Sequence, residues 1–252
     1  MSESLKIALV GTGRMGQAVE AVLDREGRHT VVARFDEAHP LGGVRDPEGE
    51  LGGADVAVDF SAPDAALDNL HQYCFWGLDA VVGTTGWYDE IDKVRGWVEE
   101  GQNGVLYAPN FSLGVAVLVR AIRGALPLLD KLDDYDPFVH EVHHTGKIDS
   151  PSGTALMLAN ELLDGLARKS HIEPETQHGP IDAEALHVSS TRAGAVFGEH
   201  TVGFDSAVDQ LQLRHIAKGR DGFAVGAVRA AEWVQGRTGL FTLDDMLADW
   251  VG

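Results

Sequence analysis

The sequence is poor in cysteine and in long hydrophobic runs, and each scarcity excludes a class of protein. Its 252 residues include one cysteine, Cys74, so no disulfide can form within the chain, as expected in the reducing cytoplasm. Cys74 lies among aromatic residues in HQYCFWG and is expected to be buried. No stretch has the roughly 20 apolar residues of a membrane-spanning helix, and the start, MSESLKIALVG, lacks signal-peptide features. We therefore expect a cytoplasmic protein without a membrane partner.

Positive charge is also scarce, and lysine is the rarer cation. The chain has 39 acidic residues against 20 basic ones, six of them lysine, and a formal net charge of −19. Such a balance disfavours nucleic acids and anionic membrane surfaces as partners. The acids are dispersed, which is typical of a folded surface. Dispersed acid with little lysine resembles proteins of halophilic cells, in which salt screens the self-repulsion; an ordinary acidic cytoplasmic protein is the alternative.

The N-terminal segment begins with the pattern of a dinucleotide-binding unit. An apolar strand at 6–10 runs directly into the glycine motif GTGRMG at 11–16, and a helical pattern follows. Gly11 allows a tight turn, Gly13 lets a pyrophosphate approach the backbone, and Gly16 permits close packing of helix and strand. Strand, glycines and helix together are a much more specific signal than the glycines alone.

An acidic residue completes this fingerprint. A second strand at 29–35 ends in Asp36, where a carboxylate would accept hydrogen bonds from an adenosine ribose. The cofactor-binding residues predicted from the fingerprint are Gly11, Thr12, Gly13, Arg14, Met15, Gly16 and Asp36.

Strand and helix patterns continue to alternate as far as residue 112. Further strands are expected at 56–60, 80–82 and 105–107. Such alternation implies a parallel sheet with right-handed crossovers, in which ligands lie beyond the carboxyl ends of the strands. The loops after these strands should therefore line the nicotinamide half of a cofactor. The residues predicted there are Gly83, Thr84, Thr85, Asn110 and Phe111.

Residues 113 to 219 follow a different pattern. The elements expected in order are a helix at 113–129, a strand at 138–144, a helix at 152–169, a loop at 170–180, and antiparallel strands at 187–192, 195–204 and 210–217. Helices at 223–235 and 243–250 end the chain. The predicted fold class is α/β, with a Rossmann-like parallel-sheet domain formed by 1–112 and 220–252 and an inserted mixed α+β domain at 113–219.

Chemically versatile side chains concentrate in HEVHHTGKIDSPSGTA at 140–155. Pro151 and Ser152 begin an amphipathic helix, with Ser152 or Thr154 as its N-cap. Backbone N–H groups and the positive end of the helix dipole at Ser152, Gly153 and Thr154 would bind a carboxylate or phosphate.

Just before this turn lie a fixed cation and two titratable groups. Lys147 carries a positive charge, and His143 and His144 can carry protons near neutral pH. An anion-binding turn beside proton donors indicates an active site.

Two other functions fit parts of the sequence. His140, Glu141 and His144 have the H-E-x-x-H spacing of zinc peptidases, which requires a helix. The alternation at 138–144 instead predicts a strand, which would hold the two histidines roughly 13 Å apart at ~3.3 Å per residue, so no metal is expected. A nucleotide-sensing regulator would keep the glycine motif but would not need the cluster of His143, His144 and Lys147.

The motifs together resemble the 4-hydroxy-tetrahydrodipicolinate reductase (dihydrodipicolinate reductase) family of the lysine and diaminopimelate pathway. The 141–155 block is close to diagnostic of that family, and the resemblance runs almost end to end. The motifs that carry it are GTGRMG at 11–16, VDFSAP at 58–63, GTTG at 83–86, APNFSLGV at 108–115, EVHHTGKIDSPSGTA at 141–155, RAGAVFGEHT at 192–201 and FAVGAVRAAEW at 223–233.

The resemblance implies an NAD(P)H-dependent reductase of a small dicarboxylate that carries a ring imine. It implies that His143 is the proton donor and that Lys147 is an essential cation. It also implies that the substrate carboxylates are held by His144, Lys147, Ser152, Gly153 and Thr154, and that the inserted domain builds a homotetramer through its sheets.

The sequence departs from many relatives in the cofactor region. Its first glycine loop is one residue shorter, which can alter the pyrophosphate turn. Glu37 follows Asp36 where many relatives have a cation suited to a 2′-phosphate, while Arg14 remains as a phosphate contact. The expected cofactors are NADH and NADPH, with NADH favoured.

Overall fold

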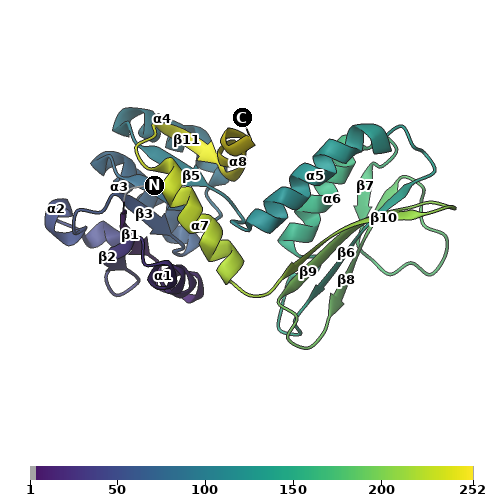
Figure 1. Cartoon of the computed structure of the whole chain (residues 1–252), viewed down its shortest axis with the longest axis horizontal. Coiled ribbons are helices and arrows are strands. Elements are labelled where there is room, and N and C mark those ends of the chain that lie inside the picture. Colours follow the sequence, from purple (N-terminus) through teal and green to yellow (C-terminus); the bar gives the residue numbers. More distant parts are fainter. Residues whose placement is uncertain (1–3, 252) are drawn as a thin grey trace. The chain divides into compact units, whose positions relative to one another are not determined.

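The computed structural model describes residues 4–251, which fold into two compact units (Figure 1). The first unit comprises Met1–Ser112 with Arg220–Gly252, and the second comprises Leu113–Gly219. The chain therefore leaves the first unit, builds the second, and returns. Within 4–251, no helix combines the length and the apolar character that crossing a membrane requires.

The first unit is built on a six-stranded parallel sheet with the order β11-β5-β4-β3-β1-β2. Its strands are β1 (Lys6–Val10), β2 (Thr30–Phe35), β3 (Val56–Asp59), β4 (Asp79–Val82), β5 (Gly104–Tyr107) and β11 (Gly239–Thr242). The central strands are apolar without alternation because helices cover both faces. The order reverses between β1 and β3, the switch point at which open α/β sheets bind ligands. The sheet is Rossmann-like, as predicted.

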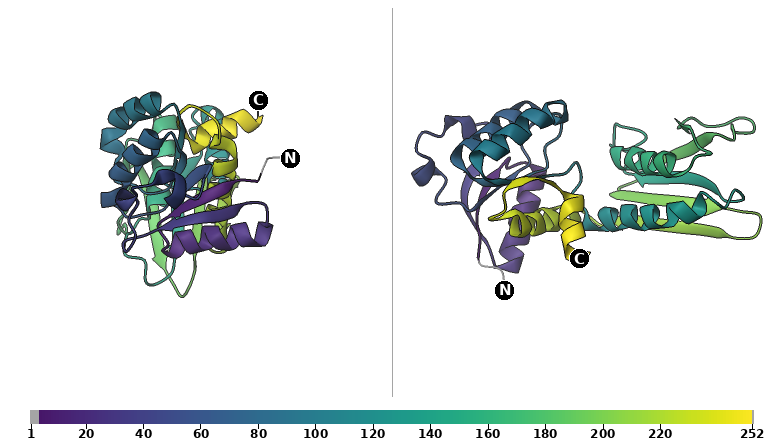
Figure 2. Two further views of the ribbon diagram at one scale, coloured as in Figure 1. Left: turned by 90° about the vertical axis from the view of Figure 1, so that its left-hand side faces the viewer. Right: turned by 90° about the horizontal axis from the view of Figure 1, so that it is seen from above.

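Helices cover this sheet on both sides (Figure 2, right view). α1 (Arg14–Glu26) and α7 (Asp221–Val234) pack on one face, and α3 (Pro63–Trp76) and α4 (Ile91–Gly101) pack on the other. The short α2 (Pro47–Glu50) and the terminal α8 (Leu243–Val251) complete the unit. Cys74 of α3 is buried, as expected, and burial raises the pKa of its thiol to about 11.

The second unit has a mixed five-stranded sheet with the order β10-β9-β6-β8-β7. Its strands are β6 (Asp136–His143), β7 (His171–Glu173), β8 (Ala185–Arg192), β9 (Gly198–Asp205) and β10 (Gln210–Ala217). The central β6 runs parallel to β8 and antiparallel to β9. Two helices, α5 (Leu113–Leu129) and α6 (Gly153–Gly165), contact each other and pack on the sheet (Figure 1).

Alternation along β6 determines which of its side chains face the helices. Val139 pairs with Val188 and Val202, and all three join the core beneath α5 and α6. Glu141 and His143 are two and four residues further along, so they lie on this same face, at the end of the sheet near the start of α6. The opposite face carries Phe138, His140 and Val142.

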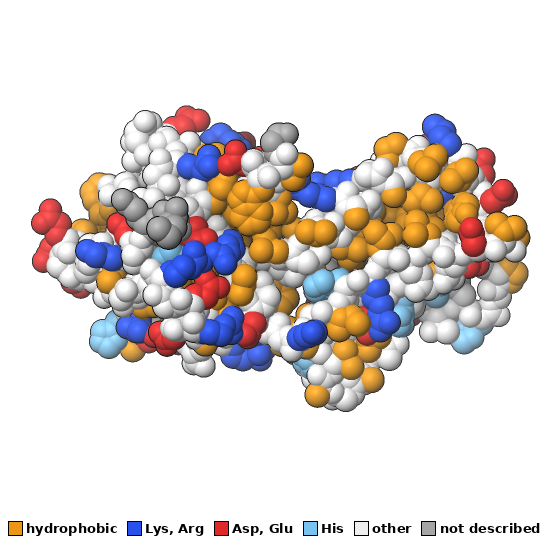
Figure 3. Space-filling model, viewed as in Figure 1, with side chains coloured by type: hydrophobic (Ala, Val, Ile, Leu, Met, Phe, Trp, Pro, Cys, Tyr) orange, Lys and Arg blue, Asp and Glu red, His pale blue; other side chains and the backbone are white. Residues whose placement is uncertain are grey.

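Hydrophobic side chains also gather on the outside of the second unit. Figure 3 shows them over α5 and α6. Val117 and Leu128 of α5 and Leu156 of α6 are among the exposed hydrophobic residues.

Three strands differ from the sequence expectation. β8, which was expected to be antiparallel, runs parallel to both β6 and β7. β7 lies in the segment 170–180, which was expected to be a loop, and β11 lies between the two C-terminal helices. Both are short strands at sheet edges, pairing only with β8 and β5 respectively. α6 also ends at Gly165, before the expected Lys169.

Candidate active site

The glycine turn after β1 has the predicted geometry. Gly11 adopts a φ of +89°, and its N–H bonds to the carbonyl of Phe35 at 2.9 Å. A Cβ on Gly16 would lie 2.0 Å from the carbonyl oxygen of Gly11, so no larger residue fits there. Gly13 is the N-cap of α1 and makes no side-chain cap, and a Cβ on it would meet nothing within 4 Å. The turn is therefore closed on the protein side and open on the solvent side.

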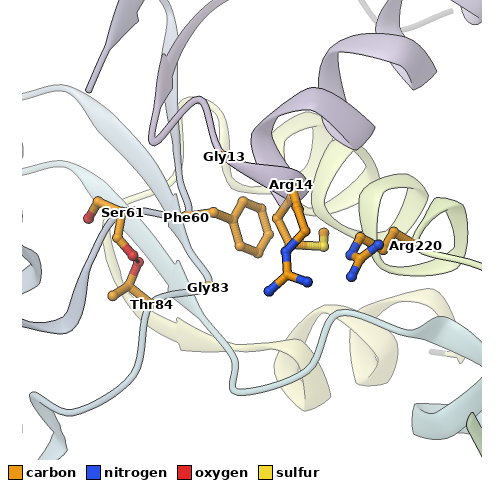
Figure 4. Close-up of a pocket in the computed structure, with 8 residues that line it drawn as sticks. Gly13, Arg14, Phe60, Ser61, Gly83, Thr84 and Arg220 are labelled. Carbon is orange, nitrogen blue, oxygen red and sulfur yellow. Dashed lines mark hydrogen bonds between the residues drawn. The ribbon is translucent and has the colours of Figure 1, made fainter. Parts of the chain in front are cut away.

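Two cavities adjoin at this turn and share the lining residues Gly13, Phe60 and Ser61. The larger, of about 950 Å³, extends over Thr12, Asp36 and Glu37. The smaller, of about 280 Å³, also includes Arg14, Met15, Gly83, Thr84 and Arg220. Figure 4 shows Arg14 and Arg220 on one side of the smaller cavity and Ser61 and Thr84 on the other, with the Phe60 ring between them.

Asp36 is held in place at the end of β2. Its Oδ1 accepts hydrogen bonds from the backbone N–H groups of His39 at 3.0 Å and Ala38 at 2.9 Å, and its Oδ2 accepts one from the Thr12 hydroxyl at 3.2 Å. These bonds, that of His39 first, lower the pKa of the Asp36 carboxyl, so it is ionised at neutral pH.

A second acid, Asp59, organises the loops after β3 and β4. It is fully buried, and its Oδ1 accepts bonds from the Ser61 N–H at 2.8 Å and the Thr84 hydroxyl at 3.2 Å. Its Oδ2 accepts bonds from Tyr73 at 2.7 Å and Asn69 at 3.0 Å. Four neutral donors thus stabilise one carboxylate, and two of them belong to loops that line the cavities.

Four residues predicted for the cofactor site lie outside the lining of these two cavities, and Gly16 of the glycine turn is one of them. Thr85 is exposed, and the Asn110 side chain accepts a bond from the Ser112 N–H at 2.8 Å. Phe111 is buried, and its ring packs edge-on against Phe60 with centroids 5.9 Å apart. Phe60 and Arg220, which line the smaller cavity, had no assigned role from the sequence; VDFSAP contained the signal for Phe60.

The first unit therefore fits a dinucleotide. An uncapped helix start with an open Gly13 suits a pyrophosphate, and the ionised Asp36 in the larger cavity suits ribose hydroxyls.

In the second unit, Glu141 and His143 form a buried pair on β6. Glu141 Oε2 accepts a hydrogen bond from His143 Nδ1. Glu141 Oε1 accepts bonds from Arg192 Nη2 at 2.8 Å and from the Ser152 N–H at 3.2 Å. Burial raises the pKa of Glu141, but hydrogen bonds and the charges of Arg192 and His143 outweigh burial, so its pKa is lowered.

The pKa of His143 is also lowered. Burial is the largest cause, Glu141 partly opposes it, and the cations Lys147 and Arg192 add to it. Among the described residues, Nε2 of His143 has no hydrogen-bond partner, so this nitrogen is available to a ligand.

A second histidine adjoins His143. The His200 ring lies edge-on to it with centroids 5.1 Å apart, and His200 Nε2 is 3.1 Å from the Ser152 hydroxyl. Burial and the neighbouring His143 lower the pKa of His200 to about 4. Ser152 is the N-cap of α6, because its Oγ accepts a bond from the Ala155 N–H at 3.2 Å.

The loop between β6 and α6 and the first turn of α6 carry the remaining predicted residues. Lys147 Nζ bonds to Asp149 Oδ1 at 2.8 Å, and Arg192 Nη2 bonds to the Asp149 carbonyl at 2.7 Å. The first turn of α6 presents the backbone of Gly153 and Thr154, and a Cβ on Gly153 would meet nothing within 4 Å. His144, the remaining predicted substrate residue, lies directly after β6 in this loop.

The zinc-peptidase interpretation does not fit this geometry. β6 is a strand, and His140 lies on the opposite face, where its Nδ1 meets the Ser189 hydroxyl at 2.8 Å. Glu141, His143 and His200 do bring ligand atoms within 4.8 Å of one another. The Arg192 guanidinium already pairs with that carboxylate, and its positive charge disfavours a cation there.

One unit thus has the features of a dinucleotide site, and the other has a buried histidine–glutamate pair beside a helix N-terminus. Such a combination is expected of a dinucleotide-dependent enzyme. The chain matches "Dihydrodipicolinate reductase, N-terminus" over residues 5–111 and "Dihydrodipicolinate reductase, C-terminus" over 114–247. It therefore belongs to the dihydrodipicolinate reductase family and is an oxidoreductase, as its motifs predicted.

Individual relatives agree over nearly the whole chain. The 4-hydroxy-tetrahydrodipicolinate reductase of Christiangramia forsetii is 37% identical over 245 residues, covering 97% of this chain and 98% of that protein. The enzyme of the same name from Caulobacter vibrioides is 36% identical and covers 98% of each. A dipicolinate-bound dihydrodipicolinate reductase from Paenisporosarcina sp. TG-14 shares the fold, with a TM-score of 0.77 at 21% identity over 95% of this chain and 98% of that chain.

Proposed function

We propose that this protein reduces 4-hydroxy-tetrahydrodipicolinate to tetrahydrodipicolinate with NADH or NADPH, in the biosynthesis of lysine and diaminopimelate. The observation that carries the proposal is the second-unit cluster, in which His143 with an open Nε2, the cation Lys147 and the start of α6 occur together. The family match supplies the substrate class, since relatives with 35–37% identity have this activity in their names.

In the proposed mechanism, the second unit binds the dicarboxylate and supplies the proton. The N–H groups of Gly153 and Thr154, the N-cap Ser152 and the side chain of His144 hold the substrate carboxylates. Lys147 stabilises the negative charge that develops in the ring. His143 donates the proton from Nε2, a contribution of roughly 10²–10⁴ in rate.

Substrate charge has a specific role in this scheme. Burial and the nearby cations lower the pKa of His143 in the free protein. Two bound carboxylates would raise that pKa, since anions favour the imidazolium. The substrate would thus bring the donor into its protonated form.

The first unit holds the cofactor, which supplies a hydride when it is bound. The turn from Gly11 to Gly16 would hold the pyrophosphate, and Asp36 would accept hydrogen bonds from the adenosine ribose. Gly83 and Thr84 flank the smaller cavity. Thr85, Asn110 and Phe111 lie in the loops after β4 and β5, at the sheet edge where the strand pattern predicts the nicotinamide half of the cofactor.

NADH is the preferred cofactor in this proposal. Asp36 and Glu37 both line the larger cavity, and an ionised Asp36 repels a 2′-phosphate. Arg14 is the opposing cation. Two carboxylates against one arginine favour NADH by about 1 kcal/mol at high effective dielectric. A double variant, Asp36→Ser with Glu37→Arg, should shift the preference to NADPH.

The proposal includes a cytoplasmic homotetramer assembled through the second unit. Its sheet face opposite α5 and α6 carries Phe138 and Val142, and Ile216 of β10 on that face is 52% exposed. Sedimentation velocity would test the assembly; a monomer at micromolar concentration would contradict it.

The test of function is turnover of 4-hydroxy-tetrahydrodipicolinate, generated in situ, with NADH and NADPH titrated in parallel. Oxidation of either cofactor that depends on the substrate, with a lower KM for NADH, is expected. Absence of substrate-dependent oxidation with both cofactors would reject the function, and a lower KM for NADPH would reject only the cofactor preference.

A further inference from the structure

The residue at the centre of the second-unit cluster is Glu141, which the sequence motifs did not single out for a role in reduction. It is fully buried, and both of its carboxylate oxygens are engaged. Burying a carboxylate costs free energy unless it is paired and hydrogen-bonded, so the position of Glu141 beside His143 requires an explanation.

One oxygen determines how the His143 ring is held. Oε2 of Glu141 accepts from Nδ1 of the ring, and the bond made by one ring nitrogen sets which nitrogen carries the proton in the neutral form. Nε2 is then left for a ligand. Gly198 leaves room beside it, because a Cβ at that position would lie only 3.0 Å from Nε2.

The other oxygen links the ring to the substrate-binding elements. Oε1 accepts from the backbone N–H of Ser152, the N-cap of α6, and from Arg192 Nη2. The same Nη2 bonds to the Asp149 carbonyl at 2.7 Å, in the loop that carries Lys147. One carboxylate therefore connects the imidazole, the start of α6 and the Lys147 loop.

We propose that Glu141 is the positioning residue of this site: it holds His143 by Nδ1, so that Nε2 faces the substrate, and fixes the Ser152 turn and the Lys147 loop relative to that ring. This inference rests on the proposed role of His143 as the proton donor. Glu141 itself touches neither substrate nor cofactor in this scheme.

The charge of Glu141 also acts on His143. The charged or titratable groups that face the ring are Glu141 on the same strand, Lys147 in the loop, Arg192 of β8 and His200 of β9. Glu141 is the one anion among them and raises the pKa of His143, against burial and the two cations. Replacing it with a neutral isostere should lower that pKa further.

The kinetic test compares Glu141→Gln with Glu232→Gln. Glu232 lies in the first unit, where it pairs with His29 and Arg229, so the same exchange is made in a similar cluster away from the site. Glu141→Gln should lower kcat at neutral pH by at least about tenfold, a part of the 10²–10⁴ that general acid catalysis contributes, with the KM for NADH unchanged. The alkaline limb of the pH profile should move to lower pH, because the donor loses its proton sooner.

Glu232→Gln should leave both kcat and the pH profile unchanged. Glu141→Asp, which keeps the charge, should keep the limb near its wild-type position. A folded Glu141→Gln with wild-type kcat and an unmoved profile would overturn the proposal.

A measurement on the wild-type chain covers the case in which Glu141→Gln does not fold. Nitrogen-15 NMR of the histidine rings, with His143 assigned from the signals lost in His143→Gln, reports which nitrogen is protonated. Neutral His143 should carry its proton on Nδ1, and a proton on Nε2 would overturn the inference. A different result would reject the proposed function and not the role of Glu141: the wild type would be inactive, or His143→Gln would be fully active.

Discussion

Each unit contains a histidine paired with a glutamate that is also bound by arginine, and the two clusters use these residues differently. In the first unit, His29 accepts a bond at Nδ1 from the Leu5 N–H at 3.1 Å and meets Glu232 through Nε2 at 2.8 Å. In the second unit, His143 meets Glu141 through Nδ1, and its Nε2 has no partner within 4–251.

The difference lies in the second ring nitrogen. With both nitrogens bonded, His29 connects the segment before β1 to α7 and cannot exchange a proton with a ligand without breaking a structural bond. With one nitrogen bonded to a carboxylate, His143 is oriented and still able to transfer a proton. The same residue types thus form a structural link in one unit and, in the proposed function, hold the proton donor in the other.

The largest expected effect comes from removing each ring in turn. His143→Gln should lower kcat by roughly 10²-fold or more while the KM for NADH stays unchanged. His29→Gln should leave kcat unchanged and reduce the free energy of unfolding by about 1–3 kcal/mol, because buried partners lose their bonds. Steady-state kinetics and urea unfolding measure the two effects. If the kcat of His143→Gln lies within a factor of a few of the wild-type value, His143 is not the proton donor and the two clusters do not differ in this way.

The cation beside each cluster gives the next largest effect. Lys147→Ala should cost about 2–4 kcal/mol of transition-state stabilisation, by analogy with the loss of an oxyanion donor. Arg229→Ala, which removes a cation from the first-unit cluster, should change stability without changing kcat/KM. Kinetics of both variants provide the check, and wild-type kcat/KM in Lys147→Ala would place the substrate elsewhere.

His200, which has no counterpart in the first-unit cluster, should make the free energy of unfolding depend on pH. The pKa of His200 is about 4 in the folded protein and roughly 6.5 when unfolded, so between these values the unfolded chain binds a proton that the folded chain does not. The contribution of neutral His200 to the free energy of unfolding is therefore fully present above about pH 6.5. It is lost as the pH decreases towards 4, by up to about 3 kcal/mol.

Urea unfolding at pH 7 and pH 4.5 measures this loss. A His200→Asn variant serves as the control, since it retains every other titrating group. If the wild type and His200→Asn lose equal stability over this range, His200 does not titrate as described.

Salt should have the smallest effect, and it should act outside the clusters. The net charge of −19 is dispersed over the chain, and the Debye length falls to about 3 Å at 1 M salt. Screening should raise stability by about 1 kcal/mol, equal to about 2–4 °C in Tm for a chain of this size. His29→Gln and His143→Gln should gain as much as wild type, because their rings are shielded from solvent. A flat or falling Tm would leave the halophile interpretation without support.

Local patterns predicted the parts of the fold that local forces determine. The glycine turn, the strand alternation predicted at 138–144 and the N-cap predicted at Ser152 or Thr154 follow from neighbouring residues. The structure has the turn, the strand β6 at Asp136–His143 and the cap at Ser152. β7 and β11 were missed because three or four residues carry little periodicity, and each forms by pairing with a strand distant in sequence.

The candidate site likewise combines residues that local sequence identifies with residues that only the tertiary structure brings in. His143, Lys147 and the α6 turn lie within one short stretch and could be identified together. Arg192 becomes part of the site only because β8 pairs with β6 in a register that places it opposite His143. Arg220 joins the smaller cavity from a segment more than 100 residues beyond the other lining residues. Such contacts depend on tertiary pairing, which one sequence does not reveal.

The return of the chain at Arg220 has a consequence for synthesis on the ribosome. α7 packs against β3, β4 and β5, so these strands of the first unit lack the helix that covers them on this face until residues 221–234 emerge. The second unit is contiguous in sequence and can complete its core beforehand. A chain truncated after residue 219 should therefore resist protease over 113–219 and be cleaved within 1–112. Equal resistance of both segments would show that the first unit folds without α7, β11 and α8.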